Sequence, residues 1–132
     1  MNVQDLQGVE LDYWVYKALG FNPEMREVKQ TPTGASKEPP VQYEARYKRG
    51  ELWHTCRPCD QFLRIVDREK ICLQYHEHDS PYWSACIDGS RIQKSKFSPN
   101  PSDWGFMIGN DPLTAAMRMY VASVYGLEVD EI

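Results

Sequence analysis

Cysteine and histidine residues in the middle of the chain have the types and spacing that could hold a metal ion. Cys56 and Cys59 are spaced as C-x-x-C, and His76 and His78 follow along the chain. Two thiolates at this spacing can share a tetrahedral zinc ion, with histidines completing the ligand set. There is no second C-x-x-C and no H-x₃₋₅-H, so the signal is weak. We expect reduced, structural cysteines and no cofactor; a zinc-bearing, nucleic-acid-associated module with Cys56, Cys59, His76 and His78 as ligands is the alternative.

Motifs of catalysis are missing from the sequence. It has no Gly-rich phosphate loop, no Gly-x-Ser-x-Gly elbow and no His-Glu-x-x-His pair. Residues 76–79, His-Glu-His-Asp, contain proton- and metal-binding groups, but Asp79-Ser80-Pro81 equally well indicates the polar end of a strand. The C-x-x-C leads into a predicted hairpin instead of opening a helix, which disfavours a thioredoxin-like role. The sequence therefore predicts a protein that is not an enzyme.

Aromatic and basic side chains are the better indication of a binding function. Tryptophan and phenylalanine are interleaved with arginine and lysine between residues 53 and 106. Flat rings stack on bases and cations neutralise phosphates, so the mixture is suited to a small anionic nucleotide. The alternative is that these tryptophans fill the core and tyrosines line an interface with another subunit or a host protein. The candidate ligand-binding residues are Trp53, Arg64, Trp83, Arg91, Trp104 and Arg118.

Two of these candidates differ from the rest. Trp104 ends the segment 97–104, which two prolines stiffen, so we expect it to close over a ligand. Stacking is worth ~1–3 kcal/mol per base, and Trp104→Ala should weaken nucleotide binding roughly ten- to a hundredfold. Arg118 lies off the apolar stripe of a predicted helix, where solvent exposure is the default.

Length and composition indicate one domain over residues 1–132. Hydrophobic residues make up 42% of the chain, enough for a core without disulfides or metal. A net charge of −4 argues against general nucleic-acid binding. No apolar run approaches the ~20 residues of a membrane span, and the first residues do not resemble a signal peptide, so we expect a location in the bacterial cytoplasm. Residues 29–40 are polar and Pro-rich and are predicted to form an excursion from this domain.

Helices are predicted at both ends of the chain. Over residues 9–19, Leu11, Trp14 and Val15 fall on one face, and Gly20 ends the helix. The second helix begins with a cap at Asn110 or Asp111 and Pro112 in the first turn, and Gly126 ends it. Its apolar stripe is Leu113, Ala116, Met117, Tyr120, Val121 and Val124.

Strands are predicted between these helices. Residues 62–66 and 70–75 flank a polar Asp67-Arg68-Glu69 turn and read as a hairpin, which extended would bring Cys59 opposite His78. Residues 81–87 form a third strand ending in a turn at 88–90, and 42–47 a fourth. The expected fold is α+β: a short antiparallel sheet of three to four strands packed on one face by both amphipathic helices, with Met117 and Tyr120 between helix and sheet.

Three segments of the chain resemble a known family. Residues 112–129 read Pro-Leu-x-Ala-Ala-Met-Arg-x-Tyr-Val-Ala-Ser-x-x-Gly-x-Glu-Val, and residues 6–20 read Leu-x-Gly-x-x-Leu-Asp-x-x-Val-x-x-Ala-x-Gly. Residues 65–71, followed by Trp83-Ser84-Ala85, match a shorter middle motif. These strings are similar to those of the bacteriophage NinX-like family, small phage proteins of unassigned function. The chain departs from that pattern at 56–60, where it carries the C-x-x-C.

The resemblance implies a phage accessory protein acting in the host cytoplasm. Combined with the aromatic and basic residues, it suggests a homo-oligomer that binds or sequesters a nucleotide-type ligand and so interferes with host signalling or defence. The alternative is an interaction module that docks on a host or phage protein. Arg118 belongs to the matching Ala-Met-Arg string, which favours an ion pair or a ligand contact for its side chain.

Overall fold

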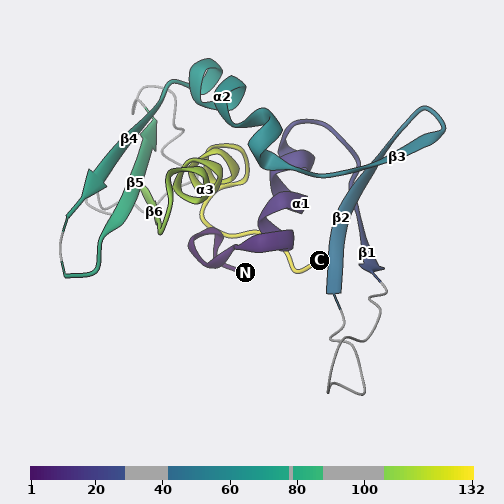
Figure 1. Cartoon of the computed structure of the whole chain (residues 1–132), viewed down its shortest axis with the longest axis horizontal. Coiled ribbons are helices and arrows are strands. Elements are labelled where there is room, and N and C mark those ends of the chain that lie inside the picture. The colour runs from purple at the N-terminus through teal and green to yellow at the C-terminus, as the bar shows by residue number, and fades with distance from the viewer. Residues whose placement is uncertain (29–41, 78, 88–105) are drawn as a thin grey trace, which may run out of the picture.

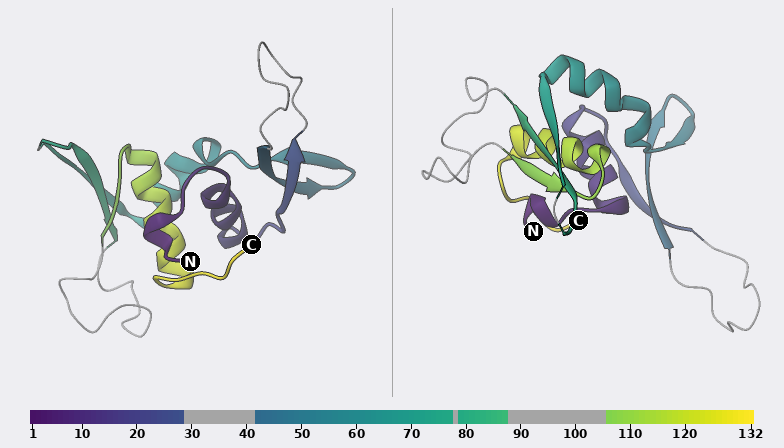
Figure 2. Two further views of the ribbon diagram at one scale, coloured as in Figure 1. Left: turned by 90° about the horizontal axis from the view of Figure 1, so that it is seen from below. Right: turned by 60° about the vertical axis from the view of Figure 1, so that its left-hand side comes forward.

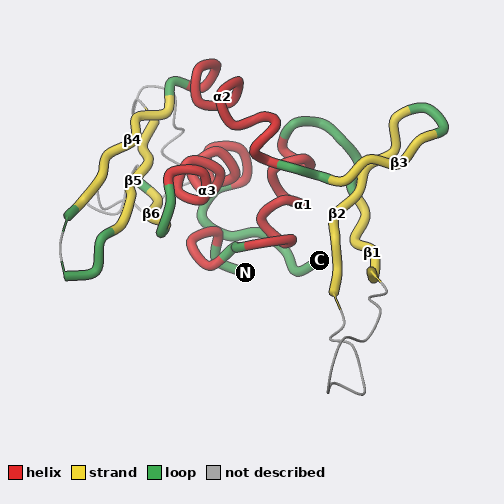
Figure 3. The backbone as a smooth tube through the Cα atoms, viewed as in Figure 1, coloured by secondary structure: helices red, strands yellow, loops and turns green. Residues whose placement is uncertain are grey.

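The structure is a computed structural model that describes residues 1–28, 42–77, 79–87 and 106–132 (Figures 1 and 3). Within these ranges the fold is α+β, as predicted, but it contains two three-stranded antiparallel sheets where one was expected. In chain order the elements are η1 (Val3–Asp5), α1 (Gly8–Ala18), β1 (Glu24–Val28), β2 (Gln42–Arg49), β3 (Leu52–Thr55), α2 (Pro58–Glu69), β4 (Ile71–His76), β5 (Tyr82–Ile87), β6 (Met107–Gly109) and α3 (Pro112–Tyr125).

Helix α3 is the centre of the molecule, and its termini are those the sequence predicts. The Thr114 N–H donates to Asp111 Oδ1 at 2.8 Å, which makes Asp111 the N-cap. Pro112 occupies the first turn, where its missing N–H costs no hydrogen bond. Gly126, at a φ of 91°, ends the helix.

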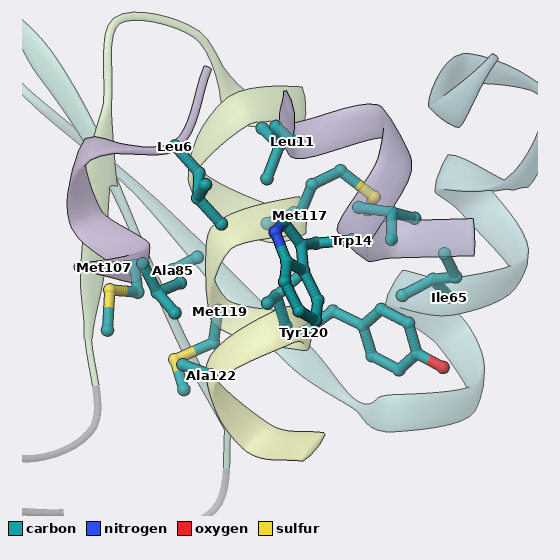
Figure 4. Packing of buried hydrophobic residues seen from close by; sticks show 14 of the residues in the cluster. Leu6, Leu11, Trp14, Ile65, Ala85, Met107, Met117, Met119, Tyr120 and Ala122 are labelled. Atoms are coloured by element: carbon teal, nitrogen blue, oxygen red, sulfur yellow. The ribbon is translucent and has the colours of Figure 1, made fainter. Parts of the chain in front are cut away.

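The predicted apolar stripe of α3 packs against helices, which corrects our expectation. Met117 and Tyr120 are buried, as predicted, but they face α1 and α2 and not a sheet (Figure 4). The Tyr120 hydroxyl donates to the Ala18 carbonyl at 3.2 Å and accepts from Arg68 Nη2 at 3.1 Å. Hydrogen bonds to both neighbouring helices therefore fix this face of α3.

The opposite face of α3 carries the second sheet. An α-helix has about 3.6 residues per turn, so Ala122 points roughly opposite to Tyr120, and Met119 points about a quarter turn away from it. Both are fully buried, and Figure 4 shows them on the side of Ala85 and Met107. A helix buried on two sides must be apolar nearly all round, which explains the small and apolar residues outside its main stripe.

Helix α1 forms as predicted, with Leu11, Trp14 and Val15 buried and Gly20 at a φ of 96° just beyond its end. It packs between α3 and the sheet β1–β2–β3. In that sheet Met25 pairs with Ala45, and Ala45 is buried on the face toward α1. The predicted strand at 42–47 is thus present, but in a separate sheet.

Helix α2 replaces the predicted strand at 62–66 and the hairpin turn at 67–69, so both predictions are wrong. Pro58 stands in its first turn, Ile65 is buried, and Lys70 ends the helix at a left-handed φ of 53°. The Tyr16 hydroxyl accepts from the Arg57 N–H at 3.2 Å and donates to the Arg57 carbonyl at 3.1 Å, which anchors its N-terminus. A short apolar run fits a buried helix as well as a strand, and here tertiary packing decides for helix.

The sheet β4–β5–β6 includes two of the predicted strands. Ile71 pairs with Ile87 and Leu73 with Ala85, and these residues face α3. The Gln4 side chain covers the β6 edge: its amide donates to the Ile108 carbonyl at 2.8 Å and accepts the Ile108 N–H at 3.0 Å. One sheet edge is thereby closed to further strands.

The molecule is a helical layer with a sheet on either side (Figures 1 and 2). A continuous cluster of buried side chains runs from Ala45 on one sheet, through the helices, to Ala85 on the other. No helix in the described ranges is long and apolar enough to cross a membrane. Each sheet turns one face to this core, so the outer faces are the surfaces available to a ligand or partner.

Candidate functional site

The outer face of β4–β5–β6 contains a hollow of about 610 Å³. Residues alternate between the two faces of a strand, so the burial of Ile71 and Ala85 against α3 turns their strand neighbours outward. A volume of this size lies within the range of small-ligand pockets. The lining residues are Cys72, Leu73, Gln74, His76, Tyr82, Ser84, Cys86 and Phe106.

A pair of parallel rings lines one end of this hollow. His76 and Tyr82 are directly opposed in the β4–β5 register, with ring centroids 4.5 Å apart and planes 8° apart. His76 Nε2 also lies 2.8 Å from Ser84 Oγ, which fixes the orientation of the imidazole. The pair offers a preoriented flat surface on which another planar group can stack.

Hydrogen-bonding groups stand beside these rings. Gln74 pairs with Ser84 across the strands, and its amide provides both donors and an acceptor. Phe106 adds an apolar ring that is 54% exposed. No lysine or arginine is among the described residues that line the hollow. In the described part of the chain, the site therefore suits a planar, hydrogen-bonding group better than an isolated anion.

Two cysteines lie at the other end of the hollow. Cys72 is directly opposite Cys86, and both are exposed free thiols. Burial, and next the neighbouring Cys72, raise the pKa of the Cys86 thiol. Cys86 is therefore protonated at neutral pH and not a permanently reactive thiolate.

The predicted tryptophans do not converge within one chain. Trp53 lies on β3, where its partner in the register is Lys48 and the Arg26 guanidinium stacks over its ring at 3.9 Å. Trp83 lies on β5 in the other sheet, on the core-facing side, with its ring 5.3 Å from that of Tyr75. The helical layer separates the two sheets (Figure 1), so Trp53 and Trp83 cannot share a ligand in one chain.

The predicted cations also fall in different places. Arg64 is exposed on α2. Arg118, a candidate for an ion pair or a ligand contact, is half-buried: its Nε donates to the Leu6 carbonyl at 2.8 Å and its Nη1 to the Ile108 carbonyl at 2.6 Å. Burial lowers the pKa of Arg118. Arg91 and Trp104, together with the predicted turn at 88–90, lie outside the described residues.

Those candidate zinc ligands that the structure describes do not lie together. Cys56 is buried at the end of β3, and Cys59 is exposed on the first turn of α2, so the hairpin that was expected to bring Cys59 opposite His78 does not form. His76 belongs to the other sheet, and His78 lies outside the described residues. Among the residues that the structure describes, no three His, Cys, Asp or Glu side chains are grouped to hold a metal.

Asp12 and Cys56 have the largest pKa shifts among the residues that the structure describes. Burial raises the pKa of Asp12 to about 6, and burial together with the Asp12 charge raises that of Cys56 to about 12. Perturbed values often mark functional sites, but neither residue lines the hollow. We interpret them as a carboxyl and an inert thiol enclosed by α1 and the first sheet.

Sequence reasoning missed most of the hollow. One feature of the sequence indicates part of the hollow: residues 72, 74 and 76 alternate with the apolar positions of the same strand, so their side chains share an outward face. The partner strand and its register supply the remaining residues, and neither is readable from composition.

Comparison with known proteins adds one relationship. The family model described as bacteriophage P22, NinX matches residues 2–124. A search of curated proteins gave no match. The match covers α1, α2, both sheets and nearly all of α3, and hence every described residue of the hollow.

Proposed function

The chain belongs to the bacteriophage P22 NinX family, and we propose that it is a non-catalytic phage accessory protein that binds a small nucleotide-type ligand. The observation that carries this proposal is the hollow on the outer face of β4–β5–β6, with its parallel rings and hydrogen-bonding groups. Binding without turnover would sequester a host nucleotide from signalling or defence in the bacterial cytoplasm.

The lining suits the base of such a ligand. The base would stack on the His76–Tyr82 pair or on Phe106, because every base has a flat π-face. The Gln74 amide would pair with the polar edge of the base, since it offers donors and an acceptor side by side. Both contacts use groups already oriented by strand pairing, which lowers the entropic cost of binding.

Residues between β5 and β6 in the sequence would meet the phosphate. Arg91, Lys94 and Lys96 follow Ile87 and precede Phe106, and both of those positions adjoin or line the hollow. A cation is required because an unpaired phosphate charge would favour water over the sheet face. The proposal also includes the expected stacking of Trp104 on the ligand. It retains the expected homo-oligomer, in which a second copy of the chain would add further contacts to the ligand.

The test is ligand-dependent melting of the full chain against adenosine, AMP, ATP and a cyclic dinucleotide. We expect phosphorylated members to raise the melting temperature more than the nucleoside does. Tyr82→Ala should weaken binding of the best member roughly ten- to a hundredfold. The matched control is Tyr75→Ala, on the opposite face of the same sheet, which should bind like wild type. A panel in which no member shifts the melting temperature would contradict the proposal.

An interaction module remains the second candidate, because one observation favours it. The outer face of β1–β2–β3 carries Trp53, half-buried under the Arg26 guanidinium. Aromatic and arginine side chains dominate the binding energy of protein interfaces. If a host or phage protein copurifies with the chain, Trp53→Ala should release it and Tyr82→Ala should not.

The zinc alternative has a direct test in the metal content of purified protein. We expect no stoichiometric zinc, and a Cys56→Ser, Cys59→Ser double variant whose melting is unaffected by chelator. Bound zinc whose removal unfolds the chain would instead support a structural metal site, because the binding energy of such a metal is folding energy.

A further inference from the structure

Cys72 and Cys86 are placed for a covalent bond. They are directly opposed in an antiparallel pair, between Ile71↔Ile87 on one side and Leu73↔Ala85 on the other. Opposed residues in such pairs have Cα atoms about 4.5–5.5 Å apart, inside the range of about 4.4–6.8 Å that a disulfide spans. Strand pairing therefore already provides the backbone geometry of a bridge.

The surroundings of the two thiols allow reaction with a small molecule. Both cysteines are exposed, and both line the hollow, so a reagent can approach either sulfur. Burial raises the pKa of the Cys86 thiol, and the neighbouring Cys72 raises that pKa further, as expected for two adjacent thiols. Cys56 is buried, and Cys59 lies on α2, so neither has this arrangement.

We propose that Cys72 and Cys86 form a thiol-modification site that reacts with low-molecular-weight disulfides and closes to a reversible cross-strand disulfide. One thiolate of the pair attacks a sulfur of glutathione disulfide, whose S–S bond breaks and releases a glutathione thiolate. The second protein thiolate then attacks the mixed disulfide and releases the second glutathione. The two protons lost by the cysteines are taken up by the two glutathiones, so the protein is oxidised and the oxidant reduced.

The bridge would close the end of the hollow opposite His76 and Tyr82, four residues further along β4. It would also link two exposed strands across a short segment of chain. Because a bridge restricts the unfolded chain, the oxidised protein should melt about 5–10 °C higher than the reduced protein. Neither effect requires a bound ligand.

The experiment uses the full chain with Cys59→Ser, so that no other exposed thiol contributes. After incubation with glutathione disulfide, the expected product is a monomer lighter by two hydrogens, with Cys72 and Cys86 joined in peptide mapping. Dithiothreitol should reverse the change. Adding Cys72→Ser or Cys86→Ser should instead leave one glutathione attached to the remaining cysteine.

Two results would overturn the proposal. One is a stable glutathione adduct on either cysteine when both are present, because a nearby thiol should displace it. The other is a disulfide-linked dimer as the main product. A trivalent arsenical provides an independent measurement: it should be retained by the Cys59→Ser protein and lost when either cysteine of the pair is replaced. Retention by both variants that lack one cysteine of the pair would also contradict a paired site.

Discussion

Arg118 shows how one side chain can stabilise the fold where a ligand contact was expected. Its guanidinium joins the N-terminal turn to β6 through the carbonyls of Leu6 and Ile108. The Ile108 carbonyl also accepts from the Gln4 amide, so the arginine and the glutamine together hold the sheet edge in place. Arg118, which belongs to the matching Ala-Met-Arg string, therefore has a structural role in this chain.

Replacing Arg118 tests this structural role. Arg118→Ala should lower the free energy of unfolding by about 2–3 kcal/mol, because charged hydrogen bonds are worth more than neutral ones and a carbonyl loses its partner. Urea unfolding is the measurement. Arg64→Ala, on the exposed side of α2, is the matched control and should change stability by less than about 0.5 kcal/mol. Equal effects of the two replacements would refute the assignment.

Asp12 gives a pH-dependent prediction. Burial raises its pKa from 3.8 to about 6, so the folded state binds more protons than the unfolded state between these values. Stability contributed by the protonated carboxyl is present below pH 3.8 and is lost as the pH rises through 6. Asp12→Asn should therefore match wild type near pH 4 and exceed it by about 1–2 kcal/mol at pH 7, allowing for partial exposure.

Urea unfolding at both pH values measures the difference. Asp130→Asn removes the same charge at an exposed position and serves as the control. A gain for Asp12→Asn that is the same at pH 4 and pH 7 would show that burial of the charge is not its cause.

At the scale of elements, helix α3 is the feature on which folding depends. Met117 is fully buried on the face toward α1 and α2. Met117→Asp would place an unpaired charge there and should cost several kcal/mol, enough to unfold a domain of ~5–15 kcal/mol stability. Thermal melting and solubility are the measurements. Leu63→Asp, at a helix position that is 76% exposed, should fold normally; cooperative melting of both variants would refute this packing.

The two terminal helices could be predicted because their signals are local. Asp111, Pro112 and Gly126 mark the ends of α3 by capping and backbone chemistry alone. Helix α2 was predicted wrongly as a strand, although Pro58 in its first turn and the helical spacing of Phe62, Ile65 and Val66 are also local signals. The same short apolar run fits a strand, and packing against α3 decides for the helix. The division into two sheets likewise depends on which strands pair with each other, and strand pairing cannot be predicted from amino-acid composition.

The candidate site, like the two sheets, depends on strand pairing that the sequence alone does not reveal. Residue type predicted that aromatic rings would be available, but the pairing of His76 with Tyr82 and of Cys72 with Cys86 depends on the β4–β5 register. Trp53 and Trp83 cannot line one surface within a single chain, because the two strands that carry them belong to different sheets. Their convergence across a subunit boundary stays a prediction. Arg91 and Trp104 keep their predicted role as a proposal.

At the scale of the whole molecule, the helical layer separates two surfaces with different chemistry. The outer face of β4–β5–β6 is hollowed and offers rings, an amide and thiols. The outer face of β1–β2–β3 offers a tryptophan under an arginine. Because they lie on opposite sides of the core (Figure 1), a small ligand and a protein partner could be bound independently.

The most direct test of nucleotide binding is a titration of isotope-labelled protein with the best member of the nucleotide panel, followed by amide chemical shifts. The account predicts saturable shifts at Gln74, His76, Ser84 and Phe106, with β1–β2–β3 unchanged. Shifts confined to Trp53 and its neighbours, or no saturable shifts on β4–β5–β6, would contradict it.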